Sequence, residues 1–335
     1  ETFRPRKLGN IQPRVKLHTV RITLANGRRS DYPPQMRLLL VDGHYYLYRS
    51  FFAIRGLTNA RGEPTNAIFG FCKAARKMIS DVRPDLGAVI WDAGLPERRT
   101  TLQPAYKQNR PEMPGEMRPQ EEWLQKNVPL LGLASLELPN TEADDLIASY
   151  ARAAVRDGHE VVIATNDKDI LQLAGTGIAI YSTAKADAAP GGFALLGHPE
   201  VRAKWGVDPH QIGDVLALTG DSSDNIPGVP GVGEKTAAKL INAHGSVEAL
   251  LRDADRLEPV KLREKILSAR ELIGANRQMV TLDEDLELPE PISNLAIRPR
   301  YPELIAALRD CGFKSLLQDV ENEAAKSVLQ QGSLL

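Results

Sequence analysis

Three short apolar runs in the first half of the chain end at, or just before, an aspartate. The runs are residues 38–41, 88–91 and 160–165, and the aspartates are Asp42, Asp92 and Asp167. Continuous apolar runs of this length predict parallel strands that are buried on both faces. The other elements expected here are strands at 134–138 and 178–182 and helices at 66–80, at 120–131 and from 141 onward. This alternation predicts an α/β fold with a mostly parallel, doubly wound sheet.

The pattern changes near residue 206, where strands give way to helices. A length of 335 residues suggests about two domains. We therefore predict an α/β domain over 36–205 and a helical subdomain over 206–322, with a basic tail (1–35) before them and a C-terminal tail (323–335) after them. The helices of the second part are expected at 209–218, 234–243, 246–252, 260–275 and 301–310.

The basic tail carries most of the charge asymmetry. Residues 1–35 hold eight Lys/Arg against two acids, a net charge of +6, which leaves −7 for the rest of a chain whose total is −1. Met36 is the first methionine and stands directly before the first strand, so we expect it to be the natural start and the tail to be an upstream extension. An organellar transit peptide is the alternative, because the tail has many arginines and few acids.

Composition argues against several classes of protein. No apolar run approaches the ~18 residues of a membrane span, and we expect no signal peptide and no membrane partner. Cys72 and Cys311 are too few for a disulfide framework and are expected to be reduced core residues. Six scattered histidines without paired cysteines indicate no zinc site. We expect a monomer in the bacterial cytoplasm or nucleoid.

Acidic residues collect where the carboxyl ends of the parallel strands meet, which is where ligands bind in such sheets. The helix that follows the strand expected at 134–138 begins there, in the stretch Thr141-Glu-Ala-Asp-Asp145. Taken alone, this stretch reads as Thr141 capping a helix with acids in its first turn. Acids scattered over a surface, however, have no reason to follow strand ends. Nine carboxylates are predicted to converge: Asp42, Asp92, Glu142, Asp144, Asp145, Asp167, Asp169, Asp221 and Asp224.

Such a cluster repels itself and raises its own pKa values unless cations neutralise it. Mg²⁺ or Mn²⁺ fits a site made only of carboxylates that keeps several waters. Two such ions about 4 Å apart are a common device for cutting phosphodiesters. The acids therefore predict a two-metal site for phosphodiester hydrolysis, with Asp144 and Asp167 central to it.

A glycine-rich turn precedes the helix expected at 234–243. It contains Gly228, Gly231 and Gly233 and continues into Lys235 and Thr236, so backbone amides at a helix N-terminus are available to an anion. A nucleotide-binding P-loop is disfavoured because Glu234 separates the last glycine from the lysine. A helix–hairpin–helix over 226–243 that grips a nucleic-acid backbone fits better. A purely structural tight turn remains the alternative.

The polar segment 95–119 holds three candidate DNA contacts, Tyr106, Lys107 and Arg110. The positive charges of Lys107 and Arg110 are expected to attract a phosphate to the acidic site. A solvated basic loop is the alternative interpretation. Tyr45 is a candidate for stacking on bases, as are Tyr46 and Tyr48, of which at least one is expected in the core. Arg49, one helical turn after Tyr45, is a further candidate phosphate contact. His44 has no assigned role.

Together these motifs resemble the 5′-nuclease domain of bacterial DNA polymerase I and the flap endonucleases. The resemblance runs from about Leu38 to about Leu317 in the family's order. Each motif is weak alone, but the whole set is specific. The matching stretches are Leu40-Val-Asp-Gly-His44 with Tyr48-Arg49, Arg61-Gly-Glu-Pro64, Asp92, Tyr106-Lys107 with Arg110, Glu142-Ala-Asp-Asp145, Asp167-Lys-Asp169, Thr219-Gly-Asp221 with Ser223-Asp-Asn225, and Gly231-Val-Gly-Glu-Lys-Thr236.

The resemblance implies a PIN-like or resolvase-like fold, a C-terminal helix–hairpin–helix subdomain, and an arch at 95–119 that passes a single-stranded 5′ end. It implies that Lys107 and Arg110 contact the reacting phosphate and that the glycine-rich turn holds a monovalent cation such as K⁺. It also divides the acids: one metal ion for the positions Asp42, Asp92, Glu142, Asp144 and Asp145, and a second for Asp167, Asp169, Asp221 and Asp224.

We therefore predict a metal-dependent 5′-3′ exonuclease and flap endonuclease that leaves a 5′-phosphate and a 3′-hydroxyl. The expected partners are DNA with a 5′ flap, a nick or an RNA-primed end, and a replication or repair polymerase. Whether the chain is a stand-alone nuclease or a domain of a polymerase stays open. The rival functions are a non-catalytic DNA-binding module, which the complete acid set disfavours, and a PIN-type ribonuclease, which the helical subdomain disfavours.

Overall fold

The computed structural model describes residues 35–184, 187 and 192–332. The basic tail expected over 1–35 lies outside these residues except for Gln35. So does most of 185–191. These residues belong to the segment 183–197, in which the stretch Ala186-Asp-Ala-Ala-Pro-Gly-Gly192 predicts a longer or looser loop than is usual in the family.

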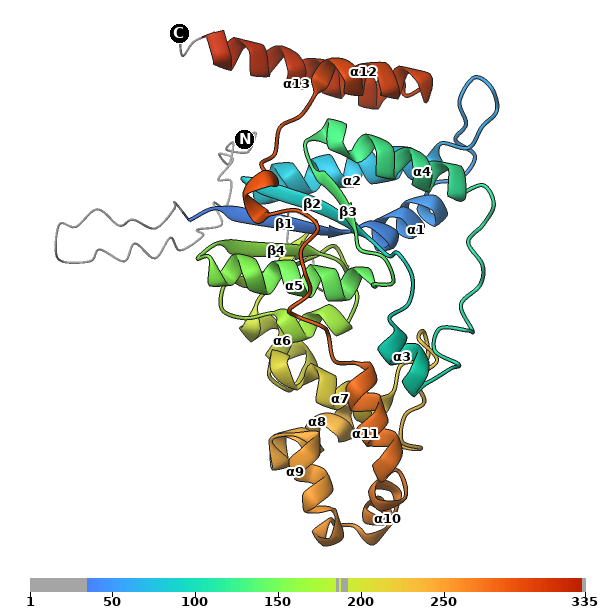
Figure 1. The fold of residues 1–335 in the computed structure, drawn as a ribbon, viewed down its shortest axis with the longest axis vertical. Coiled ribbons are helices and arrows are strands. Elements are labelled where there is room, and N and C mark those ends of the chain that lie inside the picture. Colours follow the sequence, from blue (N-terminus) through green and yellow to red (C-terminus); the bar gives the residue numbers. More distant parts are fainter. Residues whose placement is uncertain (1–34, 185–186, 188–191, 333–335) are drawn as a thin grey trace, which may run out of the picture. The chain divides into compact units, whose positions relative to one another are not determined.

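The centre of the fold is a six-stranded sheet in the order β3-β2-β1-β4-β5-β6 (Figure 1). Neighbouring strands are parallel from β3 to β5, and β6 is antiparallel to β5. The predicted doubly wound sheet is confirmed, while the three-residue β6 is too short to have given a pattern. The strands are β1 (Arg37–Asp42), β2 (Leu86–Trp91), β3 (Ala134–Glu137), β4 (Glu160–Ala164), β5 (Ile178–Ser182) and β6 (Ala194–Leu196).

Both faces of the central strand β1 are covered, which explains its continuous apolar run. Leu38 and Leu40 pack in one hydrophobic cluster with α5 (Ala143–Arg156). Leu39 and Val41 point to the opposite face and pack with α1 (Gly43–Ala53) and α2 (Asn66–Val82). Figure 1 shows α5 on one side of the sheet and α1 and α2 on the other. No polar side chain could replace these four without losing contacts on one face or the other.

The strand order places a topological switch point between β1 and β4. The chain passes from β1 to β2 and β3 on one side and then returns to β4 on the other side of β1. Crossover segments therefore leave the ends of β1 and β4 in opposite directions and open a crevice between them. Asp42, the last residue of β1, and Asp167, which follows β4, both lie at this point.

Helices complete both parts of the chain, and several of them differ from the sequence-based expectation. The helix expected at 120–131 is α-helical only to Asn127 and continues as a 3₁₀ turn, because Pro129 removes a backbone donor. The single helix expected at 260–275 is two helices that break at Ala269; Ile266 and Ile273 are both buried, so the apolar period continues across the break. The segment expected as a tail from residue 323 is helical to Gly332.

The bounds of the remaining helices are α3 (Glu97–Leu102), α4 (Arg118–Asn127), α6 (His198–Trp205), α7 (Ile212–Thr219), α8 (Glu234–His244), α9 (Val247–Arg252), α10 (Val260–Ser268), α11 (Arg270–Met279), α12 (Tyr301–Asp310) and α13 (Lys314–Gly332). Over the part of the chain that the structure describes, none of the helices combines the length and the apolar character needed to cross a membrane.

The glycine-rich turn before α8 is built on a close backbone contact. A Cβ atom on Gly228 would lie 2.0 Å from the carbonyl oxygen of Thr219, and one on Gly220, whose φ is +69°, would lie 2.3 Å from the backbone nitrogen of Gly228. Only glycine allows the two segments to approach so closely. The turn is thereby fixed to the end of α7.

This contact predicts a strong loss of stability for Gly228→Ala. We expect the free energy of unfolding to fall by about 3 kcal/mol, because backbone atoms must move to admit the methyl group. Gly274→Ala is the matched control: its Cβ meets nothing within 4 Å, and in the interior of α11 it should stabilise by roughly 0.5–1 kcal/mol. Chemical denaturation of both variants tests this. Equal stabilities would contradict the role given to Gly228.

Both cysteines are expected to be inert while the protein is folded. Cys72 and Cys311 are free and buried, and burial raises the pKa of each thiol to about 12. At pH 8 this lowers the reactive thiolate fraction by about 10³-fold relative to an exposed cysteine. Titration with a chromogenic thiol reagent should therefore detect no thiol in the native protein and both in denaturant. Rapid reaction of a native thiol would show that its neighbourhood opens.

Candidate metal centre and nucleic-acid site

The start of α5 is held by a side chain from the neighbouring strand. The sequence suggested Thr141 as the N-cap of this helix, but that prediction is wrong. Glu142 occupies the N-cap position, and its side chain makes no capping hydrogen bond. Instead the Ala143 N–H donates to Asp92 Oδ1 at 2.8 Å. Asp92 follows β2, so this bond brings the acidic stretch of α5 to the carboxyl edge of the sheet.

A cavity of about 810 Å³ opens at this edge, with four of the predicted acids among its lining residues: Asp42, Asp92, Asp144 and Asp167. They come from the ends of β1, β2 and β4 and from the start of α5. Side chains of α1 and of residues 107–114 also line it. The sheet topology, and not proximity in sequence, brings these carboxylates together.

Three acids of the cavity, Asp42, Asp144 and Asp167, have raised pKa values. Burial, followed by repulsion from Asp92 and Asp167, raises the pKa of Asp42 to about 7, although the Tyr45 N–H and the Thr165 hydroxyl each donate to it at 2.9 Å. Burial and neighbouring carboxylates raise the pKa of Asp144 well above its usual range, and they also raise the pKa of Asp167. Carboxylates in this situation are stabilised by bound cations.

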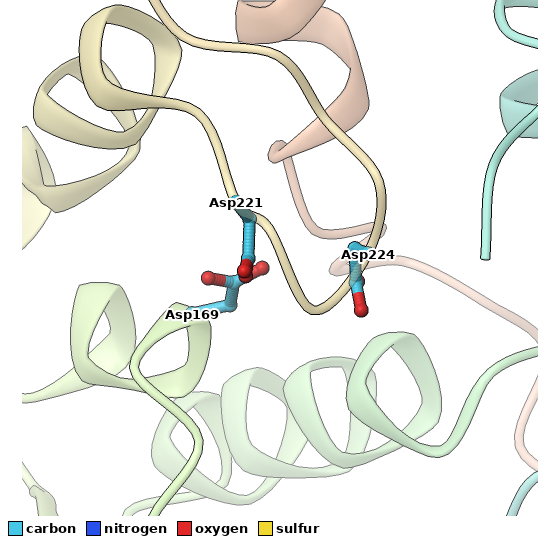
Figure 2. Close-up of side chains that lie close together, drawn as sticks. All are labelled: Asp169, Asp221 and Asp224. Atoms are coloured by element: carbon cyan, nitrogen blue, oxygen red, sulfur yellow. The ribbon is translucent and has the colours of Figure 1, made fainter. Parts of the chain in front are cut away.

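Three other predicted acids form a second group. One carboxylate oxygen from each of Asp169, Asp221 and Asp224 lies within 4.8 Å of the others (Figure 2). Asp169 Oδ1 is buried and has no hydrogen-bond partner, and burial and repulsion from Asp167 raise the pKa of this residue well above its usual range. An unpartnered buried oxygen beside two further carboxylates fits a hard divalent cation.

Lys168 supplies part of the missing charge in this second group. Its ammonium lies 3.0 Å from Asp221 Oδ1. Burial disfavours the Asp221 carboxylate, but hydrogen bonds from Ser223 and Lys168 outweigh burial and lower its pKa. Asp221 therefore has a cationic partner within the protein, whereas Asp169 Oδ1 has no partner among the described residues.

The last two predicted acids, Glu142 and Asp145, are buried against Arg99 of α3. The guanidinium of Arg99 donates to Asp145 Oδ2 at 2.6 Å and Oδ1 at 2.8 Å and also contacts Glu142. Sequence analysis missed Arg99, because the polar segment 95–119 has several arginines and α3 is too short to show a buried face. The only available signal was the excess of acids over cations in the predicted site.

Two basic residues of the segment 95–119, Lys107 and Arg110, pair with acids of the predicted site. Lys107 pairs with Glu142 and lies 3.7 Å from Asp224 Oδ2, and Arg110 pairs with Asp224. The Tyr106 hydroxyl lies 3.1 Å from Glu142 Oε1 and 3.2 Å from Asp224 Oδ2. Tyr106 is only 5% exposed, so its ring packs inside the protein; its expected contact with DNA stays a prediction.

His44, to which the sequence gave no role, connects two segments at the cavity. Its Nδ1 lies 3.1 Å from Asp92 and its Nε2 lies 2.7 Å from Glu121 of α4. Burial opposes the charged form, but the two carboxylates outweigh it and raise the pKa of His44 to about 10. The imidazolium in turn lowers the pKa of Asp92 to about 2 against the effect of burial.

Aromatic and basic side chains of α1 form a wall of the cavity. Tyr45, Tyr48, Arg49 and Phe52 line it, and Phe52 is 61% exposed. The Tyr45 hydroxyl accepts from Arg49 at 2.8 Å. Tyr46 is buried on the opposite side of the helix, in agreement with the expectation that one of the three tyrosines is a core residue.

The glycine-rich turn lies in the helical part. Gly233 precedes α8 as its N-cap, and Lys235 is exposed on the first turn of that helix, followed by a half-buried Thr236. Gly228 is required by packing, as described above, and Gly231 has a left-handed φ of +75°. The turn thus has a structural reason for two of its three glycines, independent of any ligand.

The chain matches two family models that together cover residues 37–303. Residues 37–206 match the 5′-3′ exonuclease N-terminal resolvase-like domain, and residues 207–303 match the 5′-3′ exonuclease C-terminal SAM fold. Thermostable DNA polymerase I of Thermus aquaticus is 40% identical over 288 residues, and DNA polymerase I of Bacillus subtilis is 37% identical over 298 residues. These alignments cover 86% and 88% of this chain but 33% of each polymerase.

Solved structures share the fold at low sequence identity. A flap endonuclease of bacteriophage T5, solved with DNA and metal ions, superposes with a TM-score of 0.60 at 19% identity over 87% of this chain and 98% of its own. The catalytic core of Rad2 in complex with a DNA substrate gives 0.59 at 14% identity, over 85% and 90%. The resemblance to polymerase I nuclease domains and flap endonucleases is confirmed, and the chain belongs to the 5′-3′ exonuclease family.

Proposed function

We propose that this chain is a metal-dependent, structure-selective 5′ nuclease that cleaves DNA at 5′ flaps, nicks and RNA-primed ends and leaves a 5′-phosphate and a 3′-hydroxyl. The observation that carries the proposal is the cavity at the β1/β4 switch point, which combines four desolvated aspartates with Lys107 and Arg110. Carboxylates alone would repel a phosphate, and cations alone would not activate water. Their combination is what phosphodiester hydrolysis requires.

The carboxylates fit two divalent ions, Mg²⁺ or Mn²⁺. One ion would be held by Asp42, Asp92 and Asp144 with Glu142, and the second by Asp169, Asp221 and Asp224 with Asp167. The unpartnered Asp169 oxygen and the raised pKa values of Asp42 and Asp144 support this assignment. When bound, such ions neutralise the charge on the phosphate and lower the pKa of water.

The protein's own cations would position the substrate. Lys107 and Arg110 now pair with Glu142 and Asp224, and their transfer to a phosphate would place it directly over the carboxylates. Arg49 and Tyr45 stand on the facing wall, where a phosphate and a base would contact them. The segment 95–119 would form the arch over this cavity.

The helical part would bind the duplex beside the cut. The two parts divide near residue 206, which the separate matches of residues 37–206 and 207–303 support. We propose that the turn with Gly231, Gly233, Lys235 and Thr236 contacts a phosphate backbone and holds a K⁺ ion. Because the chain spans a third of the polymerases it matches, a polymerase is the proposed partner, and the bacterial cytoplasm or nucleoid is the proposed location.

The metal proposal predicts loss of cleavage when the central acids are neutralised. Asp144→Asn and Asp167→Asn should each slow cleavage of a labelled 5′-flap duplex with Mg²⁺ by about 10³-fold or more, since each removes a ligand worth several kcal/mol to the transition state, while flap binding is largely kept. Asp285→Asn is the control, because Asp285 is exposed and its ion-pair partner among the described residues is Arg156 at 3.3 Å, far in sequence from the predicted acids. Cleavage by the wild-type chain that survives EDTA would contradict the proposal.

A separate prediction concerns the basic residues. Lys107→Ala and Arg110→Ala should lower kcat by about 10²-fold, as expected for losing one group that stabilises charge in the transition state, with a smaller change in KM. Arg118→Ala, which removes an exposed arginine from the same region, should leave kcat unchanged. Single-turnover rates with the flap substrate test this. Unaltered kcat in the first two variants would refute their assigned contact with the phosphate.

A further inference from the structure

Arg99 is a buried arginine whose five N–H donors all have acceptors. Its side chain is 4% exposed. Nε donates to the Met279 carbonyl at 2.9 Å, and Nη2 donates to the Thr281 carbonyl at 3.0 Å and to Asp145 Oδ1 at 2.8 Å. Nη1 donates to Asp145 Oδ2 at 2.6 Å and to Glu142. A planar guanidinium can satisfy all five donors only when its partners are fixed in position.

These bonds join three segments that are far apart in the sequence. Arg99 belongs to α3, at the base of the segment 95–119. Its carboxylate partners lie at the start of α5, and its carbonyl partners lie at and just beyond the end of α11. One side chain therefore links the proposed arch, the proposed metal site and the helical part of the chain.

Asp145 is fully occupied by these contacts. Both oxygens accept from Arg99, Oδ1 also accepts from the Asp283 N–H at 2.9 Å, and the residue is 1% exposed. Asp145 does not line the cavity, whereas its neighbour Asp144 does. Within the described part of the chain, Asp144 has no hydrogen-bond or ion-pair partner. Two adjacent acids of one helical turn thus have opposite surroundings.

We propose that Arg99 is a positioning residue that takes Asp145 as its counter-ion, so that Asp145 is not a metal ligand, and that fixes Glu142 and the base of the arch beside the metal site. This proposal rests on the proposed nuclease function. It reassigns Asp145, which the family resemblance placed with the first ion. The bidentate pair with Asp145 fixes the orientation of the Arg99 guanidinium. The guanidinium in turn fixes the position of the Glu142 carboxylate, to which it also donates.

The pairing makes a prediction for the metal-free protein. Removing one member of a buried ion pair leaves an uncompensated charge, whereas removing both does not. Arg99→Gln and Asp145→Asn should therefore each lower Tm by on the order of 10 °C, and the double variant should lose less than the sum of the two. Asp144→Asn should keep or raise Tm, because it relieves repulsion. Calorimetry in EDTA measures all four.

Metal binding distinguishes positioning from mere folding. With the flap substrate, Arg99→Gln should raise the half-saturating Mn²⁺ concentration by roughly 10–100-fold, as do losses of groups that orient metal ligands, with kcat largely recovered at saturation. Asp145→Asn should still bind two Mn²⁺ ions by calorimetric titration, whereas Asp144→Asn should bind fewer. Arg99→Lys keeps the positive charge but loses the planar guanidinium. Its Tm and its half-saturating Mn²⁺ concentration should lie between those of wild type and Arg99→Gln. Arg99→Lys replaces Arg99→Gln as the test variant if Arg99→Gln does not fold.

Arg98→Gln is the matched control. Arg98 lies on the same helix and donates to the carbonyls of Gln278 at 2.6 Å and Thr281 at 3.0 Å, but it contacts neither Glu142 nor Asp145. An equal metal shift in Arg98→Gln would mean that docking of α3 alone matters, and would overturn the proposal. So would loss of an ion in Asp145→Asn or additive Tm losses. If the wild-type chain cleaves no flap, the nuclease proposal fails, while Tm and Mn²⁺ stoichiometry still decide the role of Asp145.

Discussion

Repulsion among carboxylates governs this fold. Parallel strands carry their last residues to one edge of the sheet, and here that edge collects acids that burial makes costly to ionise. The protein answers with internal cations: Arg99 behind the cavity, Lys107 and Arg110 over it, Lys168 at the second group and His44 beside Asp92.

The cations do not serve the acids equally. Arg99 is buried and bidentate, so its pairing with Asp145 has a fixed geometry as well as a favourable charge. Lys107 and Arg110 come from an irregular segment, and the Arg110 side chain is 48% exposed. A site that must admit a phosphate needs some charges that stay and some that transfer. Exposure separates Arg110 from the buried Arg99, whereas the Lys107 side chain is only 10% exposed and differs from Arg99 in its place on an irregular segment.

The sequence predicted the sheet and the set of acids because both depend on local rules. Apolar runs such as 38–41 identify buried strands, and the rule that ligands bind at strand ends locates Asp42 and Asp92. The partners of those acids were not predictable in the same way. The burial of Arg99, the cap that Asp92 provides to α5 and the bridge from His44 to Glu121 join segments from 43 to 182 residues apart. No periodic pattern in the sequence records such contacts. The break between α10 and α11 at Ala269 was not predictable either, because the helical spacing of apolar residues continues across it.

The close contact between Gly228 and Thr219 has one more consequence. Thr219 stands two residues before Asp221, so the glycine-rich turn and the second group of acids are parts of one backbone unit joined without intervening side chains. Side chains change rotamer, but main chain packed on main chain does not stretch. In the proposed nuclease, with the duplex bound at the turn and the cut made at the acids, this unit would set how many nucleotides separate the bound duplex from the scissile bond.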